Sequence, residues 1–295
     1  MNDNKTLLLI DGFNLLSRGY FATAYGRTED QLYKTSKGVY NNALRVFFQK
    51  MFNLIRSHQV THLAVAWDVK REESARRQKY DFYKATRSEL PKPLIMQYEI
   101  LNRVLDRVGI KQLSIPSFEA DDVIGTVAAN WSSNQHGQCI IYSNDRDLFQ
   151  LLNNYTSQIV ASRNGELHYT IEHFREEYGI DSHQWVDVKA LLGDSSDNIP
   201  GCPGIGQKSA LPLIQQYKTL DGIYEQLETL DSKFNRYKKK LASGRESAYL
   251  SQELSRIVCD IEEYLTLTPD DLLYSINHEY LLEELAELEI RARIS

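Results

Sequence analysis

Short apolar runs that lead into acidic residues recur along this chain of 295 residues, and they constrain its fold more than any other feature. Continuous apolar runs of this length are typical of strands buried on both faces. Segments with apolar residues at helical spacing, residues 39–55 and 93–108, lie between the runs. The runs are residues 6–10, 62–67, 110–115 and 138–142, and residues 156–169 add a strand pair around Asn164-Gly165. Strands that alternate with helices predict an α/β fold with a mostly parallel sheet.

Acidic residues gather at or just beyond the carboxyl ends of these predicted strands, where open α/β sheets place their sites. For any single aspartate, a turn or a helix cap is the commoner explanation. Because acids recur beyond successive strands, we expect them to meet in one site. These acids are Asp11, Asp68, Glu119, Asp121, Asp122, Asp145 and Asp147.

The densest acidic group is Glu119-Ala120-Asp121-Asp122, at the start of a helix predicted over residues 120–131. One or two acids in a first helical turn favour the positive end of the helix dipole, so a helix start with surplus acids is one interpretation. Three carboxylates within four positions repel one another, and bound cations are the usual way to stabilise such a cluster. The other acids of the chain favour the second interpretation, half of a divalent-metal site.

A second acidic group follows a helix predicted over residues 184–192. Asp194 and Asp197 are three positions apart, so in helical conformation they would face the same way. Alone they would be a helix end followed by a loop. Beside the earlier acids they predict a second pole of the same site.

The glycine-rich segment 201–209 follows directly. Gly201 and Gly206 have the separation found in a phosphate-binding P-loop, but Gln207 stands where that motif requires lysine, and no strand precedes it. A hairpin between two helices fits better. Its glycines let backbone amides approach a phosphate backbone, and the following helix adds a favourable dipole. A helix connection without a ligand is the alternative.

Residues 70–92 form a basic segment, with eight Lys and Arg against four Asp and Glu in a chain whose formal net charge is −6. Tyr80, Phe82 and Tyr83 are interleaved with the cations. Stacking rings among phosphate-binding cations suit a single-stranded nucleic acid, whereas a solvated loop is the alternative. Acids flanked by such a segment predict phosphodiester chemistry.

The composition excludes several other classes of protein. With 42% hydrophobic and 25% charged residues the chain is not disordered, and no apolar run is long enough to span a membrane. Cys139, Cys202 and Cys259 are far apart and form no CxxC pair, which argues against structural zinc and disulfides and predicts a cytoplasmic protein. We expect two domains, residues 1–182 and 183–295.

The order and spacing of these motifs resemble the 5′-nuclease family over nearly the whole chain. This family comprises bacterial and phage flap endonucleases and 5′–3′ exonucleases, including the amino-terminal nuclease domain of DNA polymerase I. The resemblance implies a PIN-like α/β nuclease domain, a helical arch at about residues 70–92, and a helix-hairpin-helix module that grips duplex DNA. The matching motifs are Asp11-Gly12 with Arg18, Asp68, Tyr83-Lys84-Ala85-x-Arg87, Glu119-Ala120-Asp121-Asp122, Asp145-x-Asp147, Gly193-Asp194-x-x-Asp197-Asn198 and Gly204-Ile205-Gly206-x-Lys208.

The resemblance also implies roles for particular residues. Asp11, Asp68, Glu119 and Asp121 would hold one metal, Asp145, Asp147, Asp194 and Asp197 a second, with Asp122 close to both. Lys84, Arg87 and Arg18 would contact the scissile phosphate, and Tyr83 would stack on a base. Arg76, Gly204, Gly206 and Lys208 are further expected DNA contacts, although Ala75-Arg76 replaces the Phe-Arg frequent in relatives, which puts the packing of the arch in doubt.

The implied enzyme is a free-standing, monomeric nuclease that uses two or more Mg²⁺ ions, with Mn²⁺ as a substitute and K⁺ at the hairpin. Its expected substrates are 5′-flap or branched DNA and RNA–DNA hybrids in replication and repair. Two other hypotheses stay open: a non-catalytic binder of branched DNA with a relic site, and a ribonuclease on the same α/β core. The complete acid set argues against the first, and the hairpin and long basic segment argue against the second.

Overall fold

The acidic residues that follow the predicted strands lie at or beyond the ends of strands that belong to a single sheet. The structure is a computed structural model that describes residues 5–162 and 165–294. Its sheet has the strand order β3-β2-β1-β4-β5-β6, parallel throughout except for β6, which runs antiparallel to β5. The predicted turn at Asn164 lies outside the described residues. The strands are β1 (Thr6–Asp11), β2 (His62–Ala66), β3 (Lys111–Leu113), β4 (Gln138–Tyr142), β5 (Thr156–Ser162) and β6 (Gly165–Tyr169).

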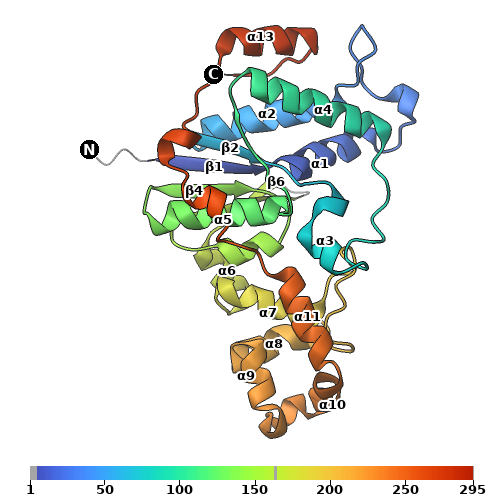
Figure 1. Ribbon diagram of the computed structural model, residues 1–295, viewed down its shortest axis with the longest axis vertical. Helices are drawn as coiled ribbons and strands as arrows, with labels where there is room; N and C mark the ends of the chain where they lie inside the picture. Colours follow the sequence, from blue (N-terminus) through green and yellow to red (C-terminus); the bar gives the residue numbers. More distant parts are fainter. Residues whose placement is uncertain (1–4, 163–164, 295) are drawn as a thin grey trace.

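Helices cover both faces of the sheet, so the fold is layered α/β/α as expected (Figure 1). In the central strand β1, Leu8 and Ile10 pack with α1, α2 and α4 on one face, whereas Leu7 and Leu9 pack with α5 on the other. This alternation explains why the strand is apolar at every position. The helices are α1 (Gly12–Ala24), α2 (Asn42–Ser57), α4 (Lys92–Arg107) and α5 (Ala120–Ser133).

A helical lobe extends from the carboxyl side of the sheet and forms a core of its own around Trp185, Leu213 and Phe234. Phe149 and Tyr178 from the sheet domain join this core, so the two parts are packed together. In Figure 1 the lobe lies at the bottom, connected to the sheet through α7 and α11. Its helices are α7 (Trp185–Leu192), α8 (Gln207–Tyr217), α9 (Leu220–Glu225), α10 (Asn235–Ser243) and α11 (Arg245–Ser255), preceded by α6 (Ile171–Tyr178).

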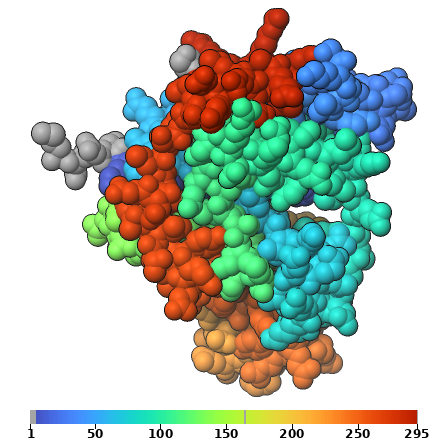
Figure 2. Space-filling model, turned by 45° about the horizontal axis from the view of Figure 1, so that its top comes forward, coloured from blue at the N-terminus to red at the C-terminus, as the bar shows by residue number. Residues whose placement is uncertain are grey.

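The last segment of the chain returns to the sheet. Ile261 and Leu272 join the core under α5, and Leu281 and Leu285 join the core on the opposite face. Figure 2 shows this segment, in orange-red, lying against the green atoms of the first domain. The domain bounds 1–182 and 183–295 stay a prediction, and the apolar side chains from residue 256 onward pack into the cores on the two faces of the sheet. The helices here are α12 (Glu262–Leu265) and α13 (His278–Glu287).

The arch contains one short helix, α3 (Ala75–Lys79). Isolated 3-10 turns complete the structure: η1 (Glu29–Gln31), η2 (Arg71–Glu73), η3 (Asp147–Leu151), η4 (Ser182–Gln184), η5 (Leu227–Thr229), η6 (Ser232–Phe234) and η7 (Pro269–Leu272). Across the ranges that the structure describes, none of the helices has both the length and the apolar character needed to cross a membrane.

Candidate active site

Asp11 stands at the junction of β1 and α1. Its carboxylate caps α1 by accepting from the Asn14 amide at 3.1 Å, and it accepts from Ser143 Oγ, at the end of β4, at 2.8 Å. The next residue has to be Gly12, because a Cβ at this position would lie only 2.6 Å from the Trp67 ring. The close packing of β1 against β2 therefore fixes the direction of the Asp11 side chain.

Asp68 and the start of α5 form the next part of the site. Asp68 Oδ1 accepts from the Ala120 amide at 3.0 Å, which ties the end of β2 to the first turn of α5. That turn carries Glu119, Asp121 and Asp122, as the sequence predicted. Parallel strands with adjacent carboxyl ends thus bring together acids that are more than fifty residues apart.

Five of these acids share one electrostatic environment. Burial raises the pKa of Asp121 well above its ordinary value, and the charges of Asp145, Asp11 and Asp68 raise it further. Burial, followed by Asp68, raises the pKa of Asp11 to about 7. Burial, followed by Asp145, likewise raises the pKa of Asp147 to about 7. Carboxylates at the ends of β1, β2 and β4 therefore oppose one another's ionisation, so a cation at this edge would be stabilising.

A tight loop after α7 carries Asp194 and Asp197. The backbones of Asp194 and Ile199 exchange two hydrogen bonds of 2.8 Å. Gly193 has a positive φ, and a Cβ there would lie 2.4 Å from the Ile199 carbonyl oxygen, so only glycine fits. Burial raises the pKa of Asp194, but hydrogen bonds from Ser196 and the ion pair with Lys189 outweigh it and hold the pKa at about 2.

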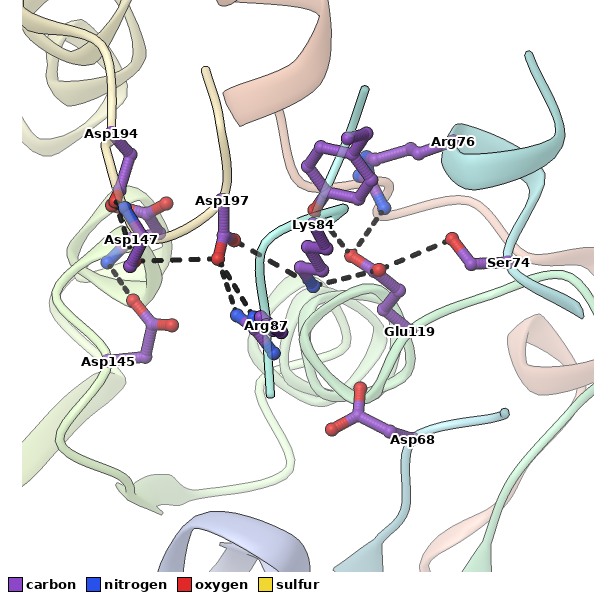
Figure 3. Close-up of polar contacts among 12 residues, drawn as sticks. Asp68, Ser74, Arg76, Lys84, Arg87, Glu119, Asp145, Asp147, Asp194 and Asp197 are labelled. Atoms are coloured by element: carbon purple, nitrogen blue, oxygen red, sulfur yellow. Dashed lines mark hydrogen bonds and ion pairs between the residues drawn. The ribbon is translucent and has the colours of Figure 1, made fainter. Parts of the chain in front are cut away.

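The arch is docked onto the acids (Figure 3). Lys84 Nζ lies 2.8 Å from Glu119 Oε1 and 3.8 Å from Asp197 Oδ2. Arg87 Nη2 lies 2.5 Å from Asp197 Oδ1. The Lys84 amide also donates to the Asp197 carbonyl at 2.9 Å. The two arch cations predicted to contact phosphate therefore pair with carboxylates of both acidic groups.

Tyr83 differs from the expectation of an exposed stacking ring. Its side chain is only 3% exposed, packs with Ile199 and Leu254, and donates its hydroxyl to Glu119 Oε2 at 2.9 Å. In this conformation the ring cannot stack on a base, because the loop after α7 and the end of α11 cover it.

Arg76 and Asp122 pair with each other, and their expected roles in DNA and metal binding stay predictions. The Arg76 guanidinium donates to both Asp122 oxygens, at 2.6 and 2.7 Å, and to the Arg256 carbonyl at 2.7 Å. Asp122 is 1% exposed and further accepts from the amides of Val258 and Glu119. Its lone pairs are thus occupied by a structural ion pair that joins the arch, α5 and the returning chain.

Arg18 lies in the middle of α1 and is half-buried. Burial and Glu166 raise the pKa of the Tyr142 phenol, and the charge of Arg18 opposes that rise, which places Arg18 close to β4. This position leaves its predicted phosphate contact a prediction.

The hairpin has its expected form. Gly204 has a φ of 79°, and Gly206 begins α8 in a reciprocal pair of hydrogen bonds with Ser209. Lys208 is exposed in the first turn of α8. Lys240 of α10, which the motifs did not identify, donates to the Gly204 carbonyl at 3.2 Å.

Lys189 is the site residue that the sequence analysis missed. Its Nζ lies 2.8 Å from Asp147 Oδ1 and 2.9 Å from Asp194 Oδ2. A single lysine in an otherwise apolar stretch five residues before an acid was the available indication. Among the described residues, no group of three or more His, Cys, Asp or Glu side chains is arranged so that it could hold a metal ion. Side-chain cations of the protein lie there instead. Lys84 lies between Glu119 and Asp197. Lys189 lies between Asp147 and Asp194.

Comparison with known proteins gives the class of the chain. Residues 6–179 match the model of the 5′-3′ exonuclease N-terminal resolvase-like domain, and residues 180–279 match that of the 5′-3′ exonuclease C-terminal SAM fold. The fold is therefore a PIN-like α/β domain joined to a SAM-type helical domain that carries the hairpin. The chain belongs to the 5′-3′ exonuclease family.

Individual relatives support this family assignment. The chain is 56% identical over 292 residues to a 5′-3′ exonuclease of Halalkalibacterium halodurans, covering 99% of this chain and 96% of the relative. It is 34% identical to a 5′-3′ exonuclease of Bacillus subtilis, covering 99% and 95%. It is also 36% identical to DNA polymerase I of Caldicellulosiruptor bescii, covering 98% of this chain but 33% of the polymerase.

Solved structures share the fold. The T5 D15 protein crystallised with metal ions superposes with a TM-score of 0.65 at 20% identity, covering 96% of this chain and 99% of the other. The catalytic core of Rad2 in complex with DNA substrate superposes with a TM-score of 0.59 at 15% identity, covering 98% and 88%.

Proposed function

We propose that this protein is a structure-specific 5′ nuclease that hydrolyses phosphodiester bonds of 5′-flap or branched DNA. The observation that carries the proposal is the convergence of acids from four separate segments, residues 11, 68, 119–122 and 145–147, into one electrostatic environment. The family to which the chain belongs is named for 5′-3′ exonuclease activity, and relatives of the same fold have been crystallised with metal ions and with DNA.

The residue types suit divalent cations, although the described side chains are not arranged as a ligand group of three or more. Asp147 Oδ1 is buried, with Lys189 Nζ at 2.8 Å, and the carboxyl groups around it are all oxygen ligands of the kind that Mg²⁺ prefers. Asp11, Asp68, Glu119 and Asp121 would hold one ion, and Asp145, Asp147, Asp194 and Asp197 another. Bound there, two ions would supply Lewis-acid activation for an in-line displacement at phosphorus. Asp122 is the least suited of the predicted ligands, because Arg76 and two amides already use its oxygens.

The arch supplies the cations for the phosphate. Lys84 and Arg87 carry positive charge to the edge of the acid site, where they would stabilise charge that develops on the scissile phosphate. Because both now pair with Glu119 and Asp197, substrate has to draw them from those carboxylates. The phosphate would then take the place of the acids as their partner.

The helical lobe holds the duplex in this proposal. Gly204, Gly206 and Lys208 present backbone amides and a cation to a phosphate backbone, with K⁺ as an additional ligand at the hairpin. The proposed protein acts as a cytoplasmic monomer, with RNA–DNA hybrids as further substrates, Mg²⁺ as its metal and Mn²⁺ as a substitute.

A labelled 5′-flap duplex tests the proposal. The wild-type protein with millimolar Mg²⁺ should release the flap, and the size of the product separates endonuclease from exonuclease cleavage. Asp147→Asn or Asp121→Asn should abolish cleavage while DNA binding in EDTA stays within about threefold, because only the transition state loses its charge stabilisation. An intact substrate with the wild-type protein would leave a DNA binder, and faster cleavage of single-stranded RNA would indicate a ribonuclease.

A further inference from the structure

Lys189 links two segments of the acid site. It lies in the last turn of α7, and its side chain is 14% exposed. Its ammonium nitrogen contacts Asp147 Oδ1, at the start of η3, and Asp194 Oδ2, in the loop after α7. The neighbouring Asp145 adds a third negative charge, since it raises the pKa of Asp147. One ammonium group therefore balances several carboxylates.

Both contacts are short. Lys189 donates a hydrogen bond to Asp194 at 2.9 Å. Its ion pair with Asp147 Oδ1 is 2.8 Å long. A carboxylate oxygen has two lone pairs, so Asp147 Oδ1 retains one for a second cation.

The backbone restrains the position of Lys189. Its carbonyl accepts from the Gly193 amide at 2.7 Å, which closes the end of α7. Gly193 is held against Ile199 and Gly201 so closely that a Cβ would not fit. Because helix end and loop form one tight unit, the ammonium cannot move far from Asp194 without a change of its own side-chain rotamer.

We propose that Lys189 is a positioning residue that acts as a tethered counter-cation and sets the divalent-cation affinity of the Asp147–Asp194 half of the site. This inference rests on the proposed nuclease function. The ammonium stabilises the two carboxylates in the absence of metal. A divalent ion that binds the same oxygens meets its repulsion and has to displace it from Asp147, so the lysine weakens metal binding and raises the metal concentration at which the site fills.

Replacement of the charge tests the inference. Lys189→Met and Lys189→Gln remove the ammonium and keep a side chain of similar length. Either variant should bind Mg²⁺ and Ca²⁺ at least about tenfold more tightly than the wild type in calorimetric titrations of the DNA-free protein, because a nearby unit charge is lost. Without metal the variants should melt at a lower temperature, and millimolar Mg²⁺ should raise their melting temperature more than it raises that of the wild type.

Two controls separate this effect from a general change of charge. Lys50→Met removes a lysine whose partner, at 2.7 Å, is Glu166 in β6, outside the acid set, and it should leave metal affinity unchanged. Lys189→Arg retains the charge and should restore wild-type affinity within about threefold. Unchanged or weaker metal binding in whichever of the Met and Gln variants folds would overturn the inference. The flap assay of the wild-type protein judges the nuclease proposal separately, since calorimetry needs no cleavage.

Discussion

Removal of the Arg76 side chain should undock the arch. The guanidinium donates to both Asp122 oxygens, to Glu119 Oε2 at 3.4 Å and to the Arg256 carbonyl, and its side chain is 17% exposed. Loss of one partner from a buried ion pair costs about 3–5 kcal/mol. Arg76→Met leaves Asp122 with only the backbone amides of Val258 and Glu119 as donors, and because Arg76 retains some exposure we expect a loss of about 3 kcal/mol.

Thermal unfolding measures the loss of global stability, and proteolysis measures the local opening of the arch. A loss of about 3 kcal/mol corresponds to a fall in melting temperature of about 5 °C for a protein of this size. Part of the loss belongs to local opening of the arch, so a protease should cut residues 70–92 of Arg76→Met faster than those of the wild type. The double variant Arg76→Met/Asp122→Leu should recover about half of the lost stability, because it leaves no buried unpaired charge.

The matched control is Arg175→Met, which removes an arginine whose partner Asp181 is about half exposed. Surface pairs of this kind contribute about 0–1 kcal/mol, so this control should hardly melt earlier. If Arg76→Met lost less than 1 kcal/mol and showed no faster cutting in the arch, the ion pair with Asp122 would not be what docks the arch.

Three further substitutions test neighbouring parts of the structure. Tyr83→Phe removes the hydrogen bond to Glu119 and should cost about 1 kcal/mol in a denaturant titration; DNA affinity should stay within about twofold because the ring is buried against Ile199 and Leu254 and offers no stacking face. Lys240→Met should weaken duplex binding and lower the slope of log affinity against log salt by about 0.9, the effect of one lost phosphate contact; an unchanged slope would show that this lysine serves only the Gly204 carbonyl. Glu284 is buried beneath Arg103 and Arg107, and Glu284→Gln should cost about 1–2 kcal/mol at pH 7, since both arginines are partly exposed. Burial raises the pKa of Glu284, but the two arginines outweigh it and lower the pKa. The contribution is therefore complete above the ordinary value of 4.5 and declines as pH falls through the lowered pKa, so wild type and variant should converge in stability below that range.

The central strands could be predicted because they are buried on both faces. The run at residues 138–142 corresponds to β4, and the run at residues 6–10 to β1, because few other structures bury four consecutive apolar side chains. The strand predicted over residues 110–115 was too long. It pairs only from Lys111 to Leu113, since β2 offers just Ala64–Ala66 as partners. Local pattern gives no measure of how far a neighbouring strand extends.

The site was predicted in part for a similar reason. The acids follow strands, and parallel topology alone brings them to one edge of the sheet. The partners of those acids could not be foreseen, because most of them come from distant segments. Lys189 precedes its acid by five residues but contacts Asp147 only through the packing of α7 on η3. Tyr83 is covered by Ile199 and Leu254, and a cation-rich stretch is ordinarily solvated.

The loop of residues 193–201 connects the acid site, the arch and the hairpin. Asp194 and Asp197 belong to the acid site, and the Asp197 carbonyl accepts from the Lys84 amide of the arch. At the other end Gly201 donates to Ser251 and accepts from Ser247, both on α11, just before the hairpin. The loop is held by paired backbone hydrogen bonds and by a glycine that has no room for a side chain. A duplex bound at the hairpin would therefore lie at a fixed distance from the acids, and the arch would be the element left to move.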